Sequence, residues 1–135
     1  MDSENGSGFS LLEVLIVLAI MGILASLTVP GYQQSVQQSR RVDAVALLLE
    51  LQLSQARNFA EQGEYKTSFS ALGGTRQSFS NTYYQLTFIS ADKDHWVVAA
   101  TPAGTQATDA CGVFAVDEKG AVYGGRYAVE TCWNK

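Results

Sequence analysis

An apolar run close to the N-terminus constrains this chain more than any other feature of its sequence. Residues 14–27 contain no charged side chain, and Glu13 is the only charged residue in residues 9–30. A helix needs about 20 mostly apolar residues to cross a bilayer, and this stretch can just do so. It also lacks the polar face that a core helix of a small domain would show. The sequence therefore predicts a transmembrane helix over residues 9–30 and a globular domain over residues 31–135.

A secretory signal peptide is the main alternative for this segment. Such a peptide has a basic N-terminal region, a shorter apolar core and a cleavage site between small residues. The flank from Met1 to Gly8 instead carries Asp2 and Glu4 and has no Lys or Arg, and Ile23-Leu24-Ala25 is a poor cleavage site. A membrane helix is therefore the preferred interpretation.

Glu13 is the informative residue of the apolar segment. A carboxylate inside a membrane span is costly and usually marks a function, and no Lys or Arg lies within 26 residues of it. Cleavage after Gly8 would create a free amine on Phe9, at the i,i+4 spacing at which helical residues meet. The alternative is that Glu13 lies at the level of the lipid headgroups and is solvated there. The residues alone leave both interpretations open.

The stretch Gly8-Phe9-Ser10-Leu11-Leu12-Glu13-Val14-Leu15-Ile16-Val17 resembles the N-terminal signature of type IV pilins and related pseudopilins. That signature is a short hydrophilic leader ending in Gly, then Phe or Met, then an apolar run with Glu at its fifth position. The resemblance implies a leader over residues 1–8, cleavage between Gly8 and Phe9 by a prepilin peptidase, and N-methylation of Phe9. It also implies that Glu13 meets the N-terminal amine of a neighbouring subunit during assembly.

The resemblance also implies where the chain resides. A pilin is a single-pass protein of the inner membrane with its C-terminal domain in the periplasm, and it later becomes part of the extracellular pilus. Arg40 and Arg41 lie beyond the span and give a weak signal for the opposite orientation, because Lys and Arg favour the cytoplasmic side. They lie about ten residues past Pro30, so the topology of the family outweighs them.

Gly22 and Pro30 interrupt an otherwise strong helical pattern. Both residues are unfavourable in a helix interior, and Pro also removes a backbone donor, so a kink is the least that we expect. In pilins a Gly and a Pro at the corresponding positions bound a segment that loses helicity in the filament. The resemblance therefore implies helix softening between Gly22 and Pro30.

Residues 31–62 predict an amphipathic helix that ends before Gly63, a favourable helix stop. Residues 31–39 are rich in Gln and Ser and could also form a linker, although no Gly or Pro follows Gly31 there. We interpret one stripe of apolar residues at spacings of four and three as the face that packs on a sheet: Val42, Ala46, Leu49, Leu53, Ala56 and Ala60. A coiled coil would need more heptads.

The C-terminal half has the pattern of consecutive hairpins. Residues 63–82 predict a long loop between helix and sheet, and residues 83–135 predict a β-sheet with a disulfide loop. The expected strands are separated by turn residues and cover 83–90, 95–101, 113–116 and 121–123. A long helix followed by an antiparallel meander defines an α+β fold, which is also the fold of type IV pilins.

Cys111 and Cys132 are the only two cysteines and enclose 20 residues. They permit one intramolecular disulfide, which would stabilise the fold by roughly 3 kcal/mol in an oxidising compartment. Two free buried thiols are the alternative. The resemblance favours the disulfide, because many pilins close a C-terminal loop in this way. The motifs around the cysteines, including Asp109-Ala110-Cys111-Gly112 and Glu130-Thr131-Cys132-Trp133, resemble minor pilins of the PilE type.

The sequence offers little enzymatic chemistry. His95 is the only histidine, and a turn at Asp92–Asp94 followed by a strand explains this acidic neighbourhood better than a metal site. We expect no catalytic, cofactor-binding or metal-binding residues and no enzyme activity. Only nine Lys and Arg residues within a net charge of −4 argue against a dedicated nucleic-acid surface, so no specific nucleic acid is predicted as a partner.

Together these features predict a structural minor subunit of a type IV pilus that helps to start or connect the filament. The implied partners are other major and minor pilins, the prepilin peptidase, and the inner membrane with its pilus assembly machinery. The implied roles include twitching motility and cell adhesion. Two alternatives stay open. One is a type II secretion pseudopilin, whose major type often has a calcium-binding C-terminal loop. The other is a membrane-anchored periplasmic binding module or enzyme that never polymerises.

Overall fold

The computed structural model describes residues 8–75 and 78–134, with the backbone alone of residues 28–30. Residues 1–7 of the predicted leader and residues 76–77 of the predicted loop lie outside this description. The chain divides into two compact units with the boundary between Val36 and Gln37. The second unit, which we call the head, therefore starts six residues later than the expected domain start at residue 31.

Helix α1 (Leu11–Gln62) is 52 residues long and takes part in both units. It begins two residues after Phe9 and ends immediately before Gly63, whose positive φ of 73° suits a helix stop. Residues 31–39, for which a linker was an alternative, are helical. In the first unit the side chains from Leu11 to Leu27 are exposed. This is the one helix among the described residues that is long and apolar enough to cross a membrane.

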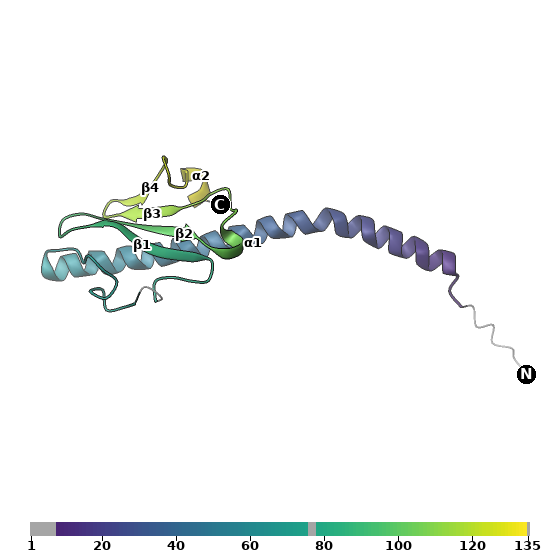
Figure 1. Ribbon diagram of the computed structural model, residues 1–135, viewed down its shortest axis with the longest axis horizontal. Coiled ribbons are helices and arrows are strands. Elements are labelled where there is room, and N and C mark those ends of the chain that lie inside the picture. Colours follow the sequence, from purple (N-terminus) through teal and green to yellow (C-terminus); the bar gives the residue numbers. More distant parts are fainter. Residues whose placement is uncertain (1–7, 76–77, 135) are drawn as a thin grey trace, which may run out of the picture. The chain divides into compact units, whose positions relative to one another are not determined.

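The head contains a four-stranded antiparallel sheet in the order β1-β2-β3-β4 (Figure 1). The strands are β1 (Tyr84–Ala91), β2 (Trp96–Pro102), β3 (Phe114–Asp117) and β4 (Gly120–Val122). The predicted α+β fold with a meander is therefore confirmed. Each strand begins and ends within one residue of its predicted position, since turn residues mark the hairpins.

The core of the head lies between one face of the sheet and the second half of α1 (Figure 1). Tyr84 and Leu86 of β1, two residues apart, are both fully buried, as expected when one face of a strand packs inward. The buried apolar cluster consists of Ala44, Leu48, Leu51, Tyr84, Leu86, Trp96, Val98, Ala100, Phe114, Val116 and Ala128.

The predicted packing stripe of α1 was wrong. All six of its residues are exposed, with Val42, Leu49 and Leu53 at 57%, 53% and 58% of their surface. The stripe that packs on the sheet is instead offset by two residues and consists of Ala44, Leu48, Leu51 and Gln55. An offset of two residues turns the helix by about 200°, so α1 carries apolar stripes on two nearly opposite faces.

The packing stripe did not stand out in the sequence because it contains a polar residue, Gln55. Its side chain is fully buried although it is polar. The amide accepts a hydrogen bond from the backbone N of Lys66 at 2.9 Å and donates to the carbonyl of the same residue at 2.7 Å. Both polar atoms are thereby satisfied, which removes most of the cost of burying them. Gln55 thus fixes the start of the connection between α1 and β1, whose described residues form no helix or strand.

Candidate functional site

The start of α1 brings together two residues that the sequence singled out. Phe9 precedes the helix and is exposed, and Glu13 lies in the first helical turn, where its backbone N donates to the carbonyl of Ser10 at 3.0 Å. Phe9 and Glu13 line one surface hollow together with apolar side chains of the next turn. The helix N-terminus also favours a negative charge. The amine that cleavage would create on Phe9 would thus arise close to Glu13.

Gly22 and Pro30 both lie inside α1, and the helix is continuous through them. A Cβ placed on Gly22 would meet nothing within 4 Å. Nothing in the described structure therefore requires glycine at this position for close packing. The physical effect of glycine at this position is therefore to weaken the helix.

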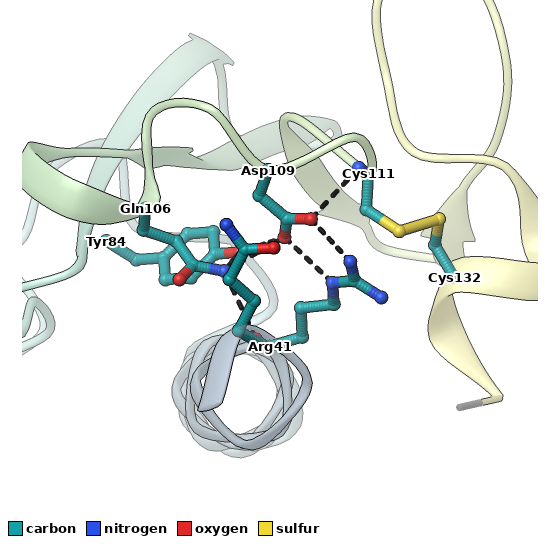
Figure 2. The surroundings of a disulfide bond; sticks show 7 residues. Arg41, Tyr84, Gln106, Asp109, Cys111 and Cys132 are labelled. Atoms are coloured by element: carbon teal, nitrogen blue, oxygen red, sulfur yellow. Dashed lines mark hydrogen bonds and ion pairs between the residues drawn. A yellow bond between two sulfur atoms is a disulfide. The ribbon is translucent and has the colours of Figure 1, made fainter. Parts of the chain in front are cut away.

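The predicted disulfide joins Cys111 to Cys132, with their Cα atoms 5.9 Å apart (Figure 2). It connects the segment before β3 to the short helix α2 (Glu130–Trp133). The ring of Trp133 packs edge-on against Phe114 of the core, with the ring centroids 5.2 Å apart. The disulfide therefore ties the C-terminal end of the chain to the core of the head.

Beside the disulfide lies a polar cluster that sequence reasoning missed. The guanidinium of Arg41 on α1 makes two hydrogen bonds to the carboxylate of Asp109, and the Nε–Oδ2 distance is 2.8 Å (Figure 2). The side chains of Arg41 and Asp109 are 14% and 0% exposed. Tyr84 and Gln106 also donate to Oδ2 of Asp109, at 3.3 and 2.9 Å. The carboxylate is thus buried with a cation and several donors, which is the arrangement that a buried charge requires.

The electrostatics of this cluster favour the ionised pair. Burial alone would raise the pKa of Asp109, but the hydrogen bond from Arg41 and the backbone N–H of Cys111 lower it below its usual range. The hydrogen bond to Asp109 raises the pKa of Arg41. Burial first of all raises the pKa of Tyr84 to about 12. At neutral pH the cluster therefore consists of a carboxylate, a guanidinium and a neutral phenol whose hydroxyl donates a hydrogen bond to the carboxylate.

Local sequence patterns carried almost no signal for this cluster. Arg41 and Asp109 are 68 residues apart, and Asp109 and Gln106 lie in a connection that reads as an ordinary loop. The one available signal was the position of Asp109 two residues before Cys111, where its Oδ1 accepts the backbone N–H of Cys111 at 3.3 Å. A polar residue so close to a predicted disulfide was a candidate for burial.

The region around His95 has the geometry of a turn. Asp92 accepts the backbone N–H groups of Asp94 and His95 at 2.8 and 2.7 Å. The ring Nδ1 of His95 lies 2.9 Å from Oε1 of Glu118 in the neighbouring hairpin turn. Among the described residues no group of three His, Cys, Asp or Glu side chains could hold a metal ion. These side chains instead hold the two turns together.

This geometry defines a class of protein: a long N-terminal helix, exposed and apolar in its first half, with a four-stranded meander and a C-terminal disulfide on the second half. The solved structure of the non-core minor pilin PilV of Neisseria meningitidis shares the fold, with a TM-score of 0.51 at 18% identity, and covers 71% of this chain and 96% of that one. Residues 5–29 match the prokaryotic N-terminal methylation motif. Residues 30–115 match the family described as type IV minor pilin ComP, DNA uptake sequence receptor. The chain belongs to this family of type IV minor pilins.

Two relatives place the chain among structural pilins. The fimbrial protein EcpC of Eikenella corrodens is 30% identical over 98 residues, which are 73% of this chain and 63% of EcpC. The type IV major pilin PilA of Myxococcus xanthus is 27% identical over 90 residues, which are 67% of this chain and 41% of PilA. The chain thus spans less than two thirds of the length of these relatives. Its family is one of structural subunits, so it is not an enzyme, and the motif and the apolar helix fit a membrane-anchored pilin.

Proposed function

We propose that this chain is a structural minor subunit of a type IV pilus that helps to initiate or connect the filament. It enters the inner membrane as a prepilin with its head in the periplasm. A prepilin peptidase cleaves it after Gly8, Phe9 is N-methylated, and the N-terminal helix then assembles with the helices of other major and minor pilins. The assembly machinery of the pilus carries out the last step, and the mature subunit becomes extracellular.

The observation that carries this proposal is the arrangement at the start of α1. A single carboxylate, Glu13, lies one turn after Phe9 on a helix whose other side chains up to Leu27 are exposed and, except for Ser26, apolar. A lone carboxylate in hydrocarbon needs a cation, and no Lys or Arg of the chain is close in sequence. The N-terminal amine of a neighbouring subunit supplies this cation and would set the register between the helices.

The exposed stripe of α1 in the head gives independent support. Val42, Leu49 and Leu53 face outward at spacings of seven and four residues, although the opposite face of the helix already packs on the sheet. A helix that is apolar on two faces is expected to be covered on both. A neighbouring pilin helix is the partner that filament assembly provides.

The role of Glu13 is tested by Glu13→Gln, which removes the charge and keeps the shape. In cells, we expect normal amounts of the variant in the membrane but at least a tenfold loss from sheared pili, measured by immunoblot. Glu50→Gln is the matched control, because Glu50 is an exposed acid on the same helix. Normal incorporation of Glu13→Gln would refute the assignment to Glu13.

Processing is tested by the intact mass of the protein purified from the membrane. A mass that lacks residues 1–8 and carries one additional methyl group supports the pilin. A retained leader would instead support a membrane-anchored module that never polymerises. The Cys111–Cys132 disulfide favours a pilin over a pseudopilin of the calcium-binding type, and the calcium content of the same sample distinguishes these two.

A second candidate function comes from one observation, the description of the matched family as a DNA uptake sequence receptor. The sequence had predicted no nucleic-acid partner. In the described part of the head, the basic side chains of Arg57, Lys119 and Arg126 have no hydrogen bond or ion pair. We infer that such free cations are the ones available to phosphate groups, and that any affinity for duplex DNA depends on them.

DNA binding is tested with the full chain in detergent micelles and a fluorescent DNA duplex. With three phosphate contacts, a fourfold increase in salt should weaken binding about 40-fold. The double variant Lys119→Gln and Arg126→Gln should weaken it further at a fixed salt concentration. Affinity that ignores both salt and these substitutions, or no saturable binding at low salt, would exclude this function.

A further inference from the structure

A ten-residue segment after β2 lies across α1 at the point where the head begins (Figure 2). We call this segment, Ala103–Gly112, the strap. Hydrogen bonds join it to one turn of the helix: Gln106 Nε2 donates to the carbonyl of Gln37 at 3.2 Å, Arg40 Nη1 to Thr105 Oγ1 at 2.9 Å, and Arg41 Nε to Asp109 Oδ2 at 2.8 Å.

The strap is itself fixed at both ends. At its start the backbone N of Ala103 donates to the carbonyl of Tyr83 at 2.8 Å. Near its end Cys111 is held by the disulfide to Cys132. The side chain of Asp109 is fully buried between these two anchors. The strap therefore cannot follow the helix if this turn of α1 unwinds.

The residues immediately before this turn are held differently. Residues 31–35 are exposed, and no side-chain hydrogen bond or ion pair is described for them. In a helix without tertiary contacts, adding or removing one helical residue changes the helix–coil equilibrium constant by less than a factor of two. Unwinding that enters from the side of Gly22 and Pro30 would thus meet little resistance up to this point.

The turn Gln37–Arg41 opposes such unwinding strongly. Separating Arg41 from Asp109 would leave a fully buried carboxylate without its cation, which is far more unfavourable than losing an exposed ion pair. Arg40 would also lose its position over the ring of Tyr83, 3.8 Å from the ring centre. A single helical turn therefore concentrates several contacts that must break together.

We propose that the strap acts as a helix stop: it keeps the turn Gln37–Arg41 helical, so that loss of helicity in α1 ends at or before Val36. The inference deepens the function proposed above and rests on it and on the softening between Gly22 and Pro30 that the pilin resemblance implies. The stop lets the helix before the head change conformation during assembly while the sheet, strap and disulfide keep their geometry. The head can then move from the membrane into the filament as one rigid body.

Hydrogen–deuterium exchange of the full chain in detergent micelles tests the stop before any assembly takes place. In the wild-type protein we expect the amides of residues 33–36 to exchange at least tenfold faster than those of residues 41–45, with a sharp step between them. Equal protection across both stretches would overturn the proposal without any variant being needed.

Asp109→Asn removes the charge from the strap and keeps its size. We expect exchange at residues 41–45 to rise at least tenfold, while residues 48–55 change less than threefold. Asp94→Asn is the matched control, because Asp94 is an exposed acid in the turn between β1 and β2, and it should leave both stretches unchanged. An unchanged profile would show that Asp109 does not hold this turn, and an equal rise up to residue 55 would show that it stabilises the whole fold; either result would overturn the stop.

If Asp109→Asn does not fold, Gln106→Met removes the hydrogen bonds from this amide to Gln37, Tyr84 and Asp109 and is judged by the same criterion. Because all these measurements use unassembled protein, they remain valid even if the chain never enters a pilus. Normal incorporation into pili together with a flat exchange profile would refute the stop alone. A clear exchange step together with no incorporation would refute the proposed function alone.

Discussion

The two stretches of α1 differ in what they leave for a partner. Up to Leu27 the first stretch is exposed and almost entirely apolar, with Glu13 as its only charge, so this surface is left for contacts outside the chain. From Gln37 to Gln62 the second stretch packs one apolar stripe on the sheet and exposes another. The first stretch needs a membrane or other helices to cover its apolar surface. The second stretch packs one face on its own sheet and leaves another face for a neighbouring molecule.

This difference separates folding from assembly along a single helix. Residues that face the sheet decide whether the head folds, and residues that face outward contribute less to the fold because more than half of the surface of Val42, Leu49 and Leu53 is exposed. A substitution can therefore be chosen to disturb one process alone. The following predictions test that separation, beginning with the largest expected effect.

Leu48→Ala and Leu49→Ala place the same change on adjacent residues of opposite environment. Leu48 is fully buried, so we expect its loss to lower the free energy of unfolding by about 2–5 kcal/mol. Leu49 is half exposed, so the same truncation should cost about 0.5 kcal/mol or less. Chemical denaturation of the full chain in micelles, followed by tryptophan fluorescence, measures both. Equal losses would mean that the two faces are not distinct.

Leu53→Lys places a charge on the exposed stripe. The free energy of unfolding of the head should stay within about 0.5 kcal/mol of the wild-type value, because 58% of the surface of Leu53 is exposed. Incorporation into sheared pili should nevertheless fall severalfold, because a lysine would have to be buried against a neighbouring helix. Arg57→Lys, an exposed position one turn further on, is the control and should incorporate normally. Unimpaired incorporation of Leu53→Lys would show that this stripe stays uncovered in the filament.

The smallest expected effect concerns the ion pair between His95 and Glu118 in two turns of the sheet. The hydrogen bond to Glu118 raises the pKa of His95 above 6.5, and the same bond lowers the pKa of Glu118 below 4.5. The contribution of His95 is complete below pH 6.5 and is lost as the pH rises through its raised pKa. The contribution of Glu118 is complete above pH 4.5 and is lost as the pH falls through its lowered pKa.

The pair should therefore stabilise the head most between pH 4.5 and 6.5. The effect is small because the side chain of His95 is 70% exposed. Melting temperatures of the wild type and His95→Gln across this range measure it. We expect the difference between them to be largest near pH 5.5 and to shrink toward pH 8. A difference that is constant with pH would exclude an ionised pair.

The elements of this fold could be read from the sequence because each has a local signal. The apolar run and Gly63 mark the two ends of α1, and turn residues such as Asp92 and Gly120 mark the hairpins. The disulfide followed from the presence of only two cysteines together with the family resemblance. These features depend on neighbours in the sequence, which is why the predicted and observed boundaries nearly coincide.

The facing of α1 and the polar cluster could not be read in this way. Two stripes of α1 satisfy the same spacing rule, and the one that packs contains Gln55, whose burial depends on the distant backbone of Lys66. Arg41 and Asp109 meet only because the chain between them folds into the sheet. In both cases the deciding partner is supplied by tertiary structure, and residue type alone pointed the wrong way or gave only a weak signal.

The second apolar stripe of α1 also has a consequence for handling the protein. A shortened chain that begins at Gln37 would lose the apolar first stretch but would still present Val42, Leu49 and Leu53 to water. Contiguous exposed apolar surface promotes self-association. Solubility, rather than loss of the native fold, would then limit the concentration that such a fragment reaches, and a polar residue in place of Leu53 would raise that limit.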